Sequence, residues 1–511
     1  MAESTLEKRG ARTAVNGPEA GLTKLNPLAD KLKLRLDEDQ LTNCMRCGFC
    51  LPACPTFRET GIEAESPRGR IALMKAVADG LMDPDEAFET QMNHCLGCRA
   101  CEPACPADVK YGQLIEQARD AIEDHTTSHR WWVKTVRSVM FKQVFPKQRN
   151  MRLLGGALQL YQRTGLARLA RGAGAMKLLP RHLADMEAIM PAASRTGVVD
   201  RIGEHVPARG PRIAKVGLFR GCLMDVLFTE TNVKTAELLA TAGFEVVIPP
   251  AQNCCGALHA HSGEAEGARA LARRNIRAFR EAGVDYIVSN AGGCGAALVE
   301  YDHLLHEDVQ WREDAAWFAQ RVIDVSELLM RSGRVTELLA VGLPETRDAA
   351  QAASSEAGSR ASAPPVADGD PRAGAVAGGT PIAAAACAPA AETITYQDSC
   401  HLRNVMRSAE APRRLLQQVA GTCYTEMCES DRCCGSAGIY NLTQPEMAGD
   451  ILAHKMEHAN RTGAGVILTS NPGCLLQMKL GVKRHGRDAE VTHVVDYLHR
   501  RLRIQEAPRR G

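Results

Sequence analysis

Several features that define other protein classes are absent from this sequence of 511 residues. It contains no run of eighteen or more apolar residues, so no segment is expected to cross a bilayer. Its formal net charge is only +2, which argues against a nucleic-acid-binding protein. The first thirty residues mix charges without an apolar core of the signal-peptide kind, so we expect a cytoplasmic protein.

One long segment lacks acidic residues. Residues 125–184 contain no Asp or Glu, yet basic residues alternate there with Trp, Phe and Leu. A basic amphipathic segment of this kind is typical of contact with an anionic membrane surface or an acidic partner. The alternative is a helical connector with a solvated basic face. We therefore predict a basic amphipathic connector over residues 125–210, with peripheral contact at the cytoplasmic face of the inner membrane as one role.

Cysteine, by contrast, is abundant, with nineteen residues in the chain. Most of them occur in clusters with regular spacing. In a chain that is not exported, clustered cysteines favour metal ligation over disulfides.

Two cysteine runs have the same spacing. We call them the first and second cysteine runs: Cys44, Cys47, Cys50 and Cys54, followed by Pro55, and Cys95, Cys98, Cys101 and Cys105, followed by Pro106. Three cysteines at every third position, a fourth after three more residues and then a proline form the ligand pattern of a [4Fe–4S] cluster. The sequence therefore predicts two such clusters. A pair of zinc sites is the alternative, but zinc ligands usually come as separated doublets.

In two-cluster domains the fourth cysteine of each run ligates the other cluster. On that rule, one cluster is held by Cys44, Cys47, Cys50 and Cys105. The other is held by Cys95, Cys98, Cys101 and Cys54.

The N-terminal part is predicted to be helical. Residues 1–36 are expected to be a mobile tail, and residues 37–124 the two-cluster domain. A short helix is expected over Leu32–Leu41. Ser66–Pro67 and Asp83–Pro84 are typical helix starts in the connector between the runs. A long helical connector favours an α-helical ferredoxin module over a small ferredoxin built on hairpins.

From residue 211 onward, strands and helices alternate and the pattern occurs twice. Strands are expected at Val216–Phe219, Glu245–Ile248, Tyr286–Ser289 and Val322–Val325, then at Thr393–Tyr396, Thr422–Glu426, Val466–Thr469 and Val491–Val495. Corresponding cysteines are offset by about 180 residues, which indicates an internal duplication. We predict two α/β units with parallel sheets at 211–344 and 392–505, joined by a disordered linker rich in Ala, Gly and Pro at 345–391.

Each unit carries a Cys-Cys-Gly (CCG) motif and two further cysteines. The first CCG set is Cys222, Cys254, Cys255 and Cys294, and the second CCG set is Cys400, Cys433, Cys434 and Cys474. Adjacent cysteines cannot both enter one apolar core, so at least one of each pair should face a site at the ends of the strands. A further cluster, a zinc ion, inert buried thiols and a vicinal disulfide all stay open for these sets.

Other candidates are less specific. Four histidines adjoin the cysteine motifs and could tune a cluster by hydrogen bonding, although ordinary packing is the simpler interpretation: His94, His259, His261 and His401. Arg68 and Arg70 offer positive charge near a cluster or are plain surface arginines. Cys423 is interpreted as a core residue and Cys428 as a spare ligand. No fingerprint for FAD or NAD is present, so we expect neither on this chain.

Taken together, the motifs resemble the glycolate oxidase iron–sulfur subunit family. The resemblance lies in the two cysteine runs, the segment Pro67–Ile71, both CCG motifs, and Cys433–Tyr440 with Leu442 and Thr443. It implies an electron-transfer subunit whose FAD-binding partner subunits oxidise glycolate to glyoxylate. The clusters would pass the electrons toward an acceptor of the respiratory chain.

Two alternatives accompany this resemblance. Subunits for D-lactate or glycerol 3-phosphate share the layout, and nothing in a chain without a substrate pocket separates them. The CCG motifs also resemble those of heterodisulfide reductase, where the CCG sites are catalytic and a further cysteine enters the cluster. That cysteine is replaced here by Ala291 and Asn471.

Overall fold

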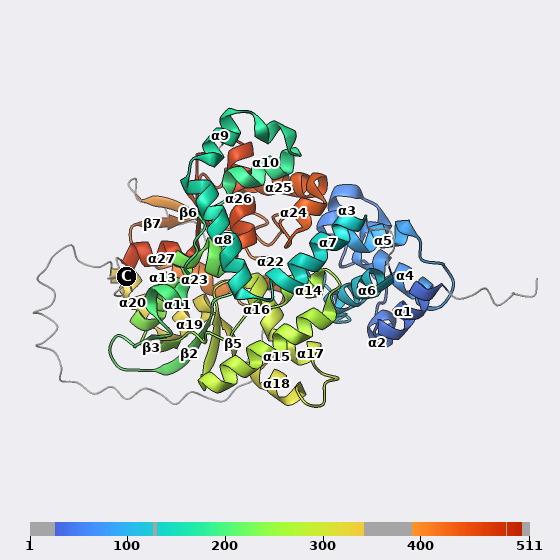
Figure 1. Ribbon diagram of the computed structural model, residues 1–511, viewed down its shortest axis with the longest axis horizontal. Helices are drawn as coiled ribbons and strands as arrows, with labels where there is room; N and C mark the ends of the chain where they lie inside the picture. Colours follow the sequence, from blue (N-terminus) through green and yellow to red (C-terminus); the bar gives the residue numbers. More distant parts are fainter. Residues whose placement is uncertain (1–25, 126–129, 342–390, 487, 503–511) are drawn as a thin grey trace, which may run out of the picture.

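The computed structural model describes residues 26–125, 130–341, 391–486 and 488–502 (Figure 1). Most of the predicted tail and nearly all of the predicted linker at 345–391 lie outside these residues. In Figure 1 the N-terminal helices are at the right, the connector helices α9 and α10 are at the top with α8 descending toward the centre, and the two sheets lie toward the left.

The N-terminal part, residues 26–125, consists of helices and loops, as predicted. Its elements are α1 Pro27–Arg35, α2 Glu38–Thr42, α3 Pro55–Thr60, the 3₁₀ turn η1 Glu63–Glu65, α4 Pro67–Ala78, α5 Glu86–Asn93 and α6 Tyr111–His125. The Ser66 side chain caps α4 by accepting a hydrogen bond from the Gly69 N–H group. Asp85 caps α5, so this helix begins two residues after the predicted start at Asp83–Pro84.

The start of this part differs from the sequence prediction. A single helix was expected over Leu32–Leu41, but α1 ends at Arg35 and α2 begins at Glu38. The break arises because the Asp37 side chain caps α2, accepting from the Gln40 N–H group at 3.1 Å. Leu28 and Leu32 of α1 are buried, so the last residues of the predicted mobile tail form part of the core.

The connector wraps over the α/β units. It comprises α7 Trp131–Val139, the π-helical turn η2 Met140–Val144, α8 Gln148–Arg163, α9 Leu166–Gly172, the 3₁₀ turn η3 Ala175–Leu178, α10 Arg181–Ile189 and α11 Val198–Ile202. Helix α7 buries none of its residues. The C-terminal part of the connector is held to the second α/β unit by an ion pair between Asp185 of α10 and Arg484, at 2.8 Å.

The first CCG unit contains a five-stranded sheet of order β1-β3-β2-β4-β5. The strands are β1 His205–Val206, β2 Ala214–Phe219, β3 Phe244–Val247, β4 Tyr286–Ser289 and β5 Val322–Asp324. The four longer strands are parallel, as predicted, whereas the short edge strand β1 pairs antiparallel with β3. The helices are α12 Met224–Leu227, α13 Thr229–Thr241, α14 Ala257–His261, α15 Ala265–Ala282, α16 Gly292–Val299, α17 Tyr301–Leu304, α18 Arg312–Arg321, α19 Val325–Ser332 and α20 Arg334–Val341.

The second CCG unit repeats this plan with four parallel strands of order β7-β6-β8-β9. The strands are β6 Glu392–Tyr396, β7 Thr422–Tyr424, β8 Val466–Thr469 and β9 Glu490–His493. The helices are α22 Cys400–Asn404, α23 Glu410–Gln417, α24 Tyr440–Thr443, α25 Pro445–Arg461, α26 Pro472–Arg484 and α27 Val494–Leu502. The predicted parallel α/β fold class is confirmed.

The two units share one hydrophobic core. Helix α13 packs against α27, and α19 packs against α23. By the duplication α13 corresponds to α23 and α19 to α27, so the same kind of contact is made twice across the interface. The core contains Leu238 and Leu239 from the first unit beside Leu415 and Leu498 from the second. The duplicated units are therefore one packed body.

Candidate metal centres

The first cysteine run forms the loop between α2 and α3. Arg46 and Gly48 adopt left-handed backbones, with φ of 54° and 90°, which turn the chain tightly between successive cysteines. Cys47 is exposed, whereas burial raises the pKa of the Cys50 thiol. Arg68 of α4 braces this loop by donating to the Arg46 carbonyl oxygen at 3.0 Å.

The second cysteine run forms an equivalent loop between α5 and α6. Its left-handed residues, Gly97 and Arg99, with φ of 65° and 59°, occupy the same positions relative to the first cysteine. The Gly97 N–H group donates to the Cys95 sulfur at 3.3 Å. Cys95 and Cys101 are buried. The two loops therefore share a backbone fold, and the second is the more deeply enclosed.

Cys54 lies near the second run although it belongs to the first. Burial raises the pKa of the Cys101 thiol, and the charges of Cys98, Cys95 and Cys54 raise it further. Burial likewise raises the pKa of Cys54, with a contribution from Cys95. This proximity supports the crossed ligand assignment. Ligation by Cys54, and by Cys105 at the first cluster, stays a prediction.

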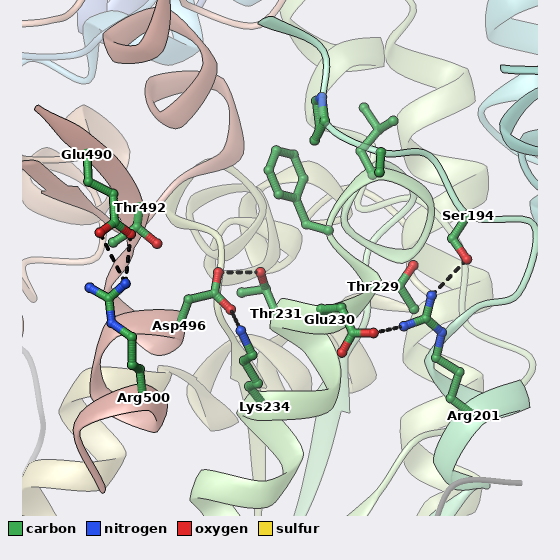
Figure 2. Close-up of a pocket in the computed structure, with 14 residues that line it drawn as sticks. Ser194, Arg201, Thr229, Glu230, Thr231, Lys234, Glu490, Thr492, Asp496 and Arg500 are labelled. Carbon is green, nitrogen blue, oxygen red and sulfur yellow. Dashed lines mark hydrogen bonds and ion pairs between the residues drawn. The ribbon is translucent and has the colours of Figure 1, made fainter. Parts of the chain in front are cut away.

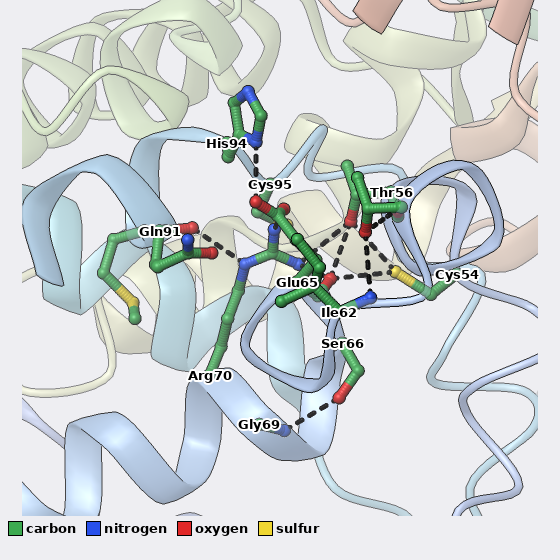
Figure 3. Close-up of polar contacts among 12 residues, drawn as sticks. Cys54, Thr56, Ile62, Glu65, Ser66, Gly69, Arg70, Gln91, His94 and Cys95 are labelled. Carbon is green, nitrogen blue, oxygen red and sulfur yellow. Dashed lines mark hydrogen bonds and ion pairs between the residues drawn. The ribbon is translucent and has the colours of Figure 1, made fainter. Parts of the chain in front are cut away.

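A buried arginine lies between the two runs (Figure 3). The Arg70 side chain is fully buried. It donates to the Gln91 carbonyl oxygen at 2.8 Å, the Thr56 hydroxyl at 3.2 Å and the Glu65 carboxylate at 2.6 Å. It also bonds to the Glu65 carbonyl oxygen, which in turn accepts from the Cys54 thiol at 3.5 Å.

Arg70 is thus no surface arginine. Burial alone would lower its pKa, but Tyr111, Cys95, Cys54 and Glu65 raise it above its ordinary value. It places a permanent positive charge beside cysteines of both runs. Arg68, in contrast, is partly exposed and pairs with Glu63 at 2.7 Å.

The first CCG set gathers at the carboxyl ends of three adjacent parallel strands. Cys222 follows β2, the pair Cys254–Cys255 follows β3, and Cys294 lies in the first turn of α16 after β4. The sulfurs of Cys222 and Cys254 are 3.5 Å apart. Hydrogen bonds continue from Cys254 to Cys255 and from Cys255 to Cys294. Four thiols therefore converge.

The second CCG set has the same arrangement. Its thiols are linked in the order Cys400, Cys433, Cys434 and Cys474. We expected at least one cysteine of each adjacent pair to face a site. The structure turns both toward the other thiols of their set, and all four paired cysteines are buried.

The glycine of each motif is required by geometry. Gly256 and Gly435 have φ of 87° and 85°. A Cβ atom on Gly435 would lie 2.6 Å from the Ala448 carbonyl oxygen of α25, too close for any side chain. The motif therefore needs glycine to bring its cysteines against the helix that follows.

The thiols fit iron–sulfur groups in their chemistry. Soft thiolate ligands suit such clusters, and each iron takes its own ligand. Within the described residues, no group of three or more Cys, His, Asp or Glu side chains surrounds a point where a single metal ion could bind. A cubane cluster makes no such demand, because its ligands bind separate iron atoms.

Of the two residues that replace the additional cysteine of heterodisulfide reductase, Asn471 connects the two sets. The Asn471 side chain donates to the Cys474 sulfur at 3.6 Å and accepts from the Gly293 N–H group at 3.1 Å. Its counterpart Ala291 is buried and contributes no polar atom.

The second cysteine run packs directly against the second CCG unit. His401 donates to the Gly97 carbonyl oxygen at 2.9 Å, and Asn404 to that of Cys98, also at 2.9 Å. After burial, the charge of Cys400 is the largest cause that raises the pKa of Cys98. The second run therefore lies next to the second CCG set.

The four histidines near the motifs bond to groups other than cysteine sulfur. His94 and His261 contact Glu65 and Glu116 at 2.8 and 2.7 Å, and His259 donates to the Phe141 carbonyl oxygen at 2.9 Å. The packing interpretation therefore holds for these rings.

Two further cysteines lie in the second CCG unit. Cys428 is exposed, as the proposed ligand Cys47 is, and its interpretation as a spare ligand stays a prediction. Cys423 on β7 is half-buried and disulfide-bonded, so its interpretation as a core residue was wrong.

A polar cavity of about 400 Å³ lies between α13, α27 and the end of the connector (Figure 2). Its cationic side chains are all paired. Lys234 contacts Asp496 at 2.9 Å, Arg500 contacts Glu490 at 3.0 Å, and Arg201 contacts Glu230. A charged ligand would have to break these pairs, so the cavity offers no ready binding site.

Sequence reasoning missed Lys455, which is buried beside the second CCG set. The signal was present, because Lys455 falls on the apolar face formed by Ile451, Leu452, Met456 and Ala459 of one helix. A lysine at such a position has to find partners inside the protein.

No helix among the described residues is both long and apolar enough to span a membrane.

Three family models match four segments of the chain. Residues 40–109 match a 4Fe-4S dicluster domain, and residues 132–190 match the linker region of the glycolate oxidase iron-sulfur subunit. Residues 216–299 and 394–479 each match a cysteine-rich domain.

Curated relatives extend the similarity to nearly the whole chain. The probable glycolate oxidase iron-sulfur subunit of Bacillus subtilis is 44% identical over 93% of this chain and 97% of its own length. The glycolate oxidase iron-sulfur subunit of Escherichia coli is 28% identical over 85% of this chain and 88% of its own. Lactate utilization protein A of Oceanobacillus iheyensis is 27% identical, but over only 56% of this chain and 96% of its own. With two cysteine runs, two CCG sets and this whole-length similarity, the chain belongs to the glycolate oxidase iron–sulfur subunit family.

Proposed function

We propose that this chain carries electrons from FAD-binding subunits, which oxidise glycolate to glyoxylate, toward an acceptor of the respiratory chain. One observation carries the proposal: the second cysteine run packs against the second CCG set within one continuous body. Two groups of thiols suited to redox centres therefore lie next to each other in the protein. That the family consists of iron–sulfur subunits agrees with this role.

The proposed ligands are the cysteines of the two runs. Cys44, Cys47, Cys50 and Cys105 would hold one [4Fe–4S] cluster, and Cys95, Cys98, Cys101 and Cys54 the other. When bound, these groups supply one-electron carriers. The proximity of Cys54 to Cys95 and Cys101 supports the second of these sets, and Arg70 supplies a buried charge beside cysteines of both runs. For the CCG sets we propose a further cluster, with zinc as the alternative outcome.

Reconstitution with the flavin partners tests the function. The anaerobic chain should lose its visible cluster absorbance when the flavin subunits and glycolate are added together, and keep it when either is absent. Reduction by D-lactate but not by glycolate would contradict the proposal. Iron analysis separates the cofactor alternatives, since about eight irons per chain fit two cubane clusters and about twelve fit a third.

Two matched variants test the crossed ligands. Cys54→Ser should alter the electron paramagnetic resonance signal of the cluster beside Arg70 and Cys400. Cys105→Ser should alter the other signal, because its proposed partners Cys44, Cys47 and Cys50 belong to the first run. If each substitution changes the cluster of its own run, the crossed assignment is wrong.

The lactate alternative rests on the lactate utilization relatives. They match a little over half of this chain, whereas the glycolate oxidase subunits also span most of the remainder. This difference in coverage favours glycolate. Copurification from the native cell, with the partner's substrate identified, decides between the two.

We also propose peripheral contact of the connector with the cytoplasmic face of the inner membrane. Trp131 is 80% exposed and Leu169 is 67% exposed, and basic residues surround both. Arg137 is already held by Glu123 and Glu264 at 3.1 and 3.2 Å, so exposed residues are the better targets. Flotation with anionic vesicles should fall after replacing Arg130, Lys134 and Arg168 by Gln, and unchanged flotation would contradict the contact.

A further inference from the structure

The two CCG sets differ in charge at one buried position. Lys455 of α25 is 1% exposed. Its ammonium group donates to the carbonyl oxygens of Glu429 at 2.6 Å and Ser430 at 3.4 Å, in the loop that leads to the second cysteine pair. The offset of about 180 residues that relates the units places Asn275 of α15 at the equivalent position of the first unit.

Asn275 holds the corresponding loop of the first unit with a neutral side chain. Its amide nitrogen donates to the Cys254 carbonyl oxygen and to the Tyr301 hydroxyl, both at 2.9 Å. Its amide oxygen accepts from the Asn253 N–H group at 2.8 Å. Because a neutral side chain can hold this loop, the charge of Lys455 is not needed for the fold of the motif.

The positive charge of Lys455 acts on the thiols. Burial lowers the pKa of Lys455, whereas the nearby thiolates of Cys400 and Cys434 act in the opposite sense and favour the ammonium form. The first CCG set also has a buried cation nearby, because Arg220 stands two residues before Cys222 and is 4% exposed. Asp225 pairs with Arg220 at 3.8 Å, whereas the hydrogen bonds of the Lys455 ammonium go to carbonyl oxygens. The second set therefore has a buried positive charge that no carboxylate pairs with among the described residues.

Lys455 lines a small cavity together with Cys433 and with Ala53 and Pro55, the two neighbours of Cys54. Leu96, Cys400 and Cys433 lie in one apolar cluster, against which Cys98 packs. Charged side chains join the N-terminal part to both units, such as Arg99 with Glu300 of the first and Arg58 with Glu429 of the second.

We infer that Lys455 is a positioning residue that makes the second CCG set, rather than the first, the receiving site for an electron from the second cysteine run. In this step one electron leaves the site of the second run, which is oxidised, and enters the site of the second CCG set, which is reduced. No bond forms or breaks and no proton moves. A buried ammonium stabilises the added negative charge through the weakly screened interior. The inference rests on the proposed function only in requiring redox groups at both sites.

Redox titration of the whole chain tests the inference. The anaerobic protein is reduced stepwise with dithionite and followed by electron paramagnetic resonance, with iron per chain measured in parallel. Lys455→Met and Lys455→Gln should each lower the ratio of reduced to oxidised second CCG site about tenfold at fixed potential, a shift of about 59 mV for one electron. Lys455→Arg should stay near the parent value. Lys483→Gln, which removes an exposed lysine of α26, is the matched control.

The variants separate charge from structure. Lys455→Gln keeps a donor for the Glu429 carbonyl oxygen. If Lys455 only held the loop in place, the Lys455→Gln protein would keep the parent reduction potential and the Lys455→Met protein would lose iron. That pattern would overturn the inference, as would unchanged potentials in both variants or only two cluster signals in the parent protein. Dithionite supplies the electrons, so a failure of glycolate oxidation would overturn the proposed function while leaving these potentials measurable.

Discussion

Replacement of Arg70 by Met should loosen the N-terminal part markedly. The guanidinium is fully buried and bonds to Gln91, Thr56 and Glu65. Its removal leaves the Glu65 carboxylate, itself 4% exposed, without its cationic partner. Breaking a buried pair from one side costs about 3–5 kcal/mol.

The expected loss can be measured as a change in urea resistance. With an m-value of about 2 kcal/mol per molar urea, 3–5 kcal/mol lowers the midpoint for loss of cluster absorbance by about 2 M. Arg68→Met is the matched control two residues away. Its partly exposed pair with Glu63 is worth about 0–1 kcal/mol, and its hydrogen bond to the Arg46 carbonyl oxygen about 1 kcal/mol. Its midpoint should therefore fall by no more than about 1 M.

A double variant isolates the unpaired carboxylate. Adding Glu65→Gln to Arg70→Met removes the buried charge and should recover at least about 1 kcal/mol. The reasoning is refuted if Arg70→Met and Arg68→Met have the same midpoint, or if the double variant is less stable than Arg70→Met.

Three further predictions concern other contacts. Burial lowers the pKa of His401 from 6.5 to about 4, so between these values the ring is neutral in the folded protein and protonated in the unfolded one. About 3 kcal/mol of stability should therefore be lost as pH falls from 6.5 to 4. His401→Gln should flatten this pH dependence of the free energy of unfolding, measured by urea titration. Gly435→Ala should destabilise the second CCG unit by at least about 1–2 kcal/mol and release iron on heating. Gly283→Ala is the control, because Gly283 has φ of 58° but no atom lies within 4 Å of the added Cβ. Its destabilisation should come from backbone strain alone. The hydrogen bond to Glu59 raises the pKa of His454. The stability that protonated His454 adds to the folded protein is therefore present below pH 6.5 and is lost as pH rises through the raised pKa. His454→Gln should abolish this part of the pH dependence of thermal unfolding.

Much of the architecture follows from local sequence signals. The alternation of apolar strands and amphipathic helices located the parallel strands of both units, because such strands are short, buried and rich in Val and Ile. Ser66–Pro67 located the start of α4, since a cap and a first-turn proline act only on neighbouring residues. The cysteine spacing located the two loops.

What the sequence left open depends on contacts between distant segments. The sequence left open whether Arg70 is a surface residue or lies near a cluster, because its partner Gln91 becomes a neighbour only when α4 and α5 pack. The break between α1 and α2 was missed because the capping side chain of Asp37 outweighs the apolar periodicity around it. The placement of the second run against Cys400 joins residues about three hundred positions apart, which no local pattern encodes.

The reciprocal pairing of α13 with α27 has a consequence for how the chain acquires its fold. Thr231 and Lys234 bond to Asp496, and His499 contacts Glu237, so the first unit is completed by residues of the second unit that are synthesised about 260 positions later. Until then a large apolar face of α13 is uncovered, and folding has to close a long loop. We therefore expect a chain truncated before residue 494 to aggregate during synthesis, even though every cysteine of both runs and both CCG sets would already have been made.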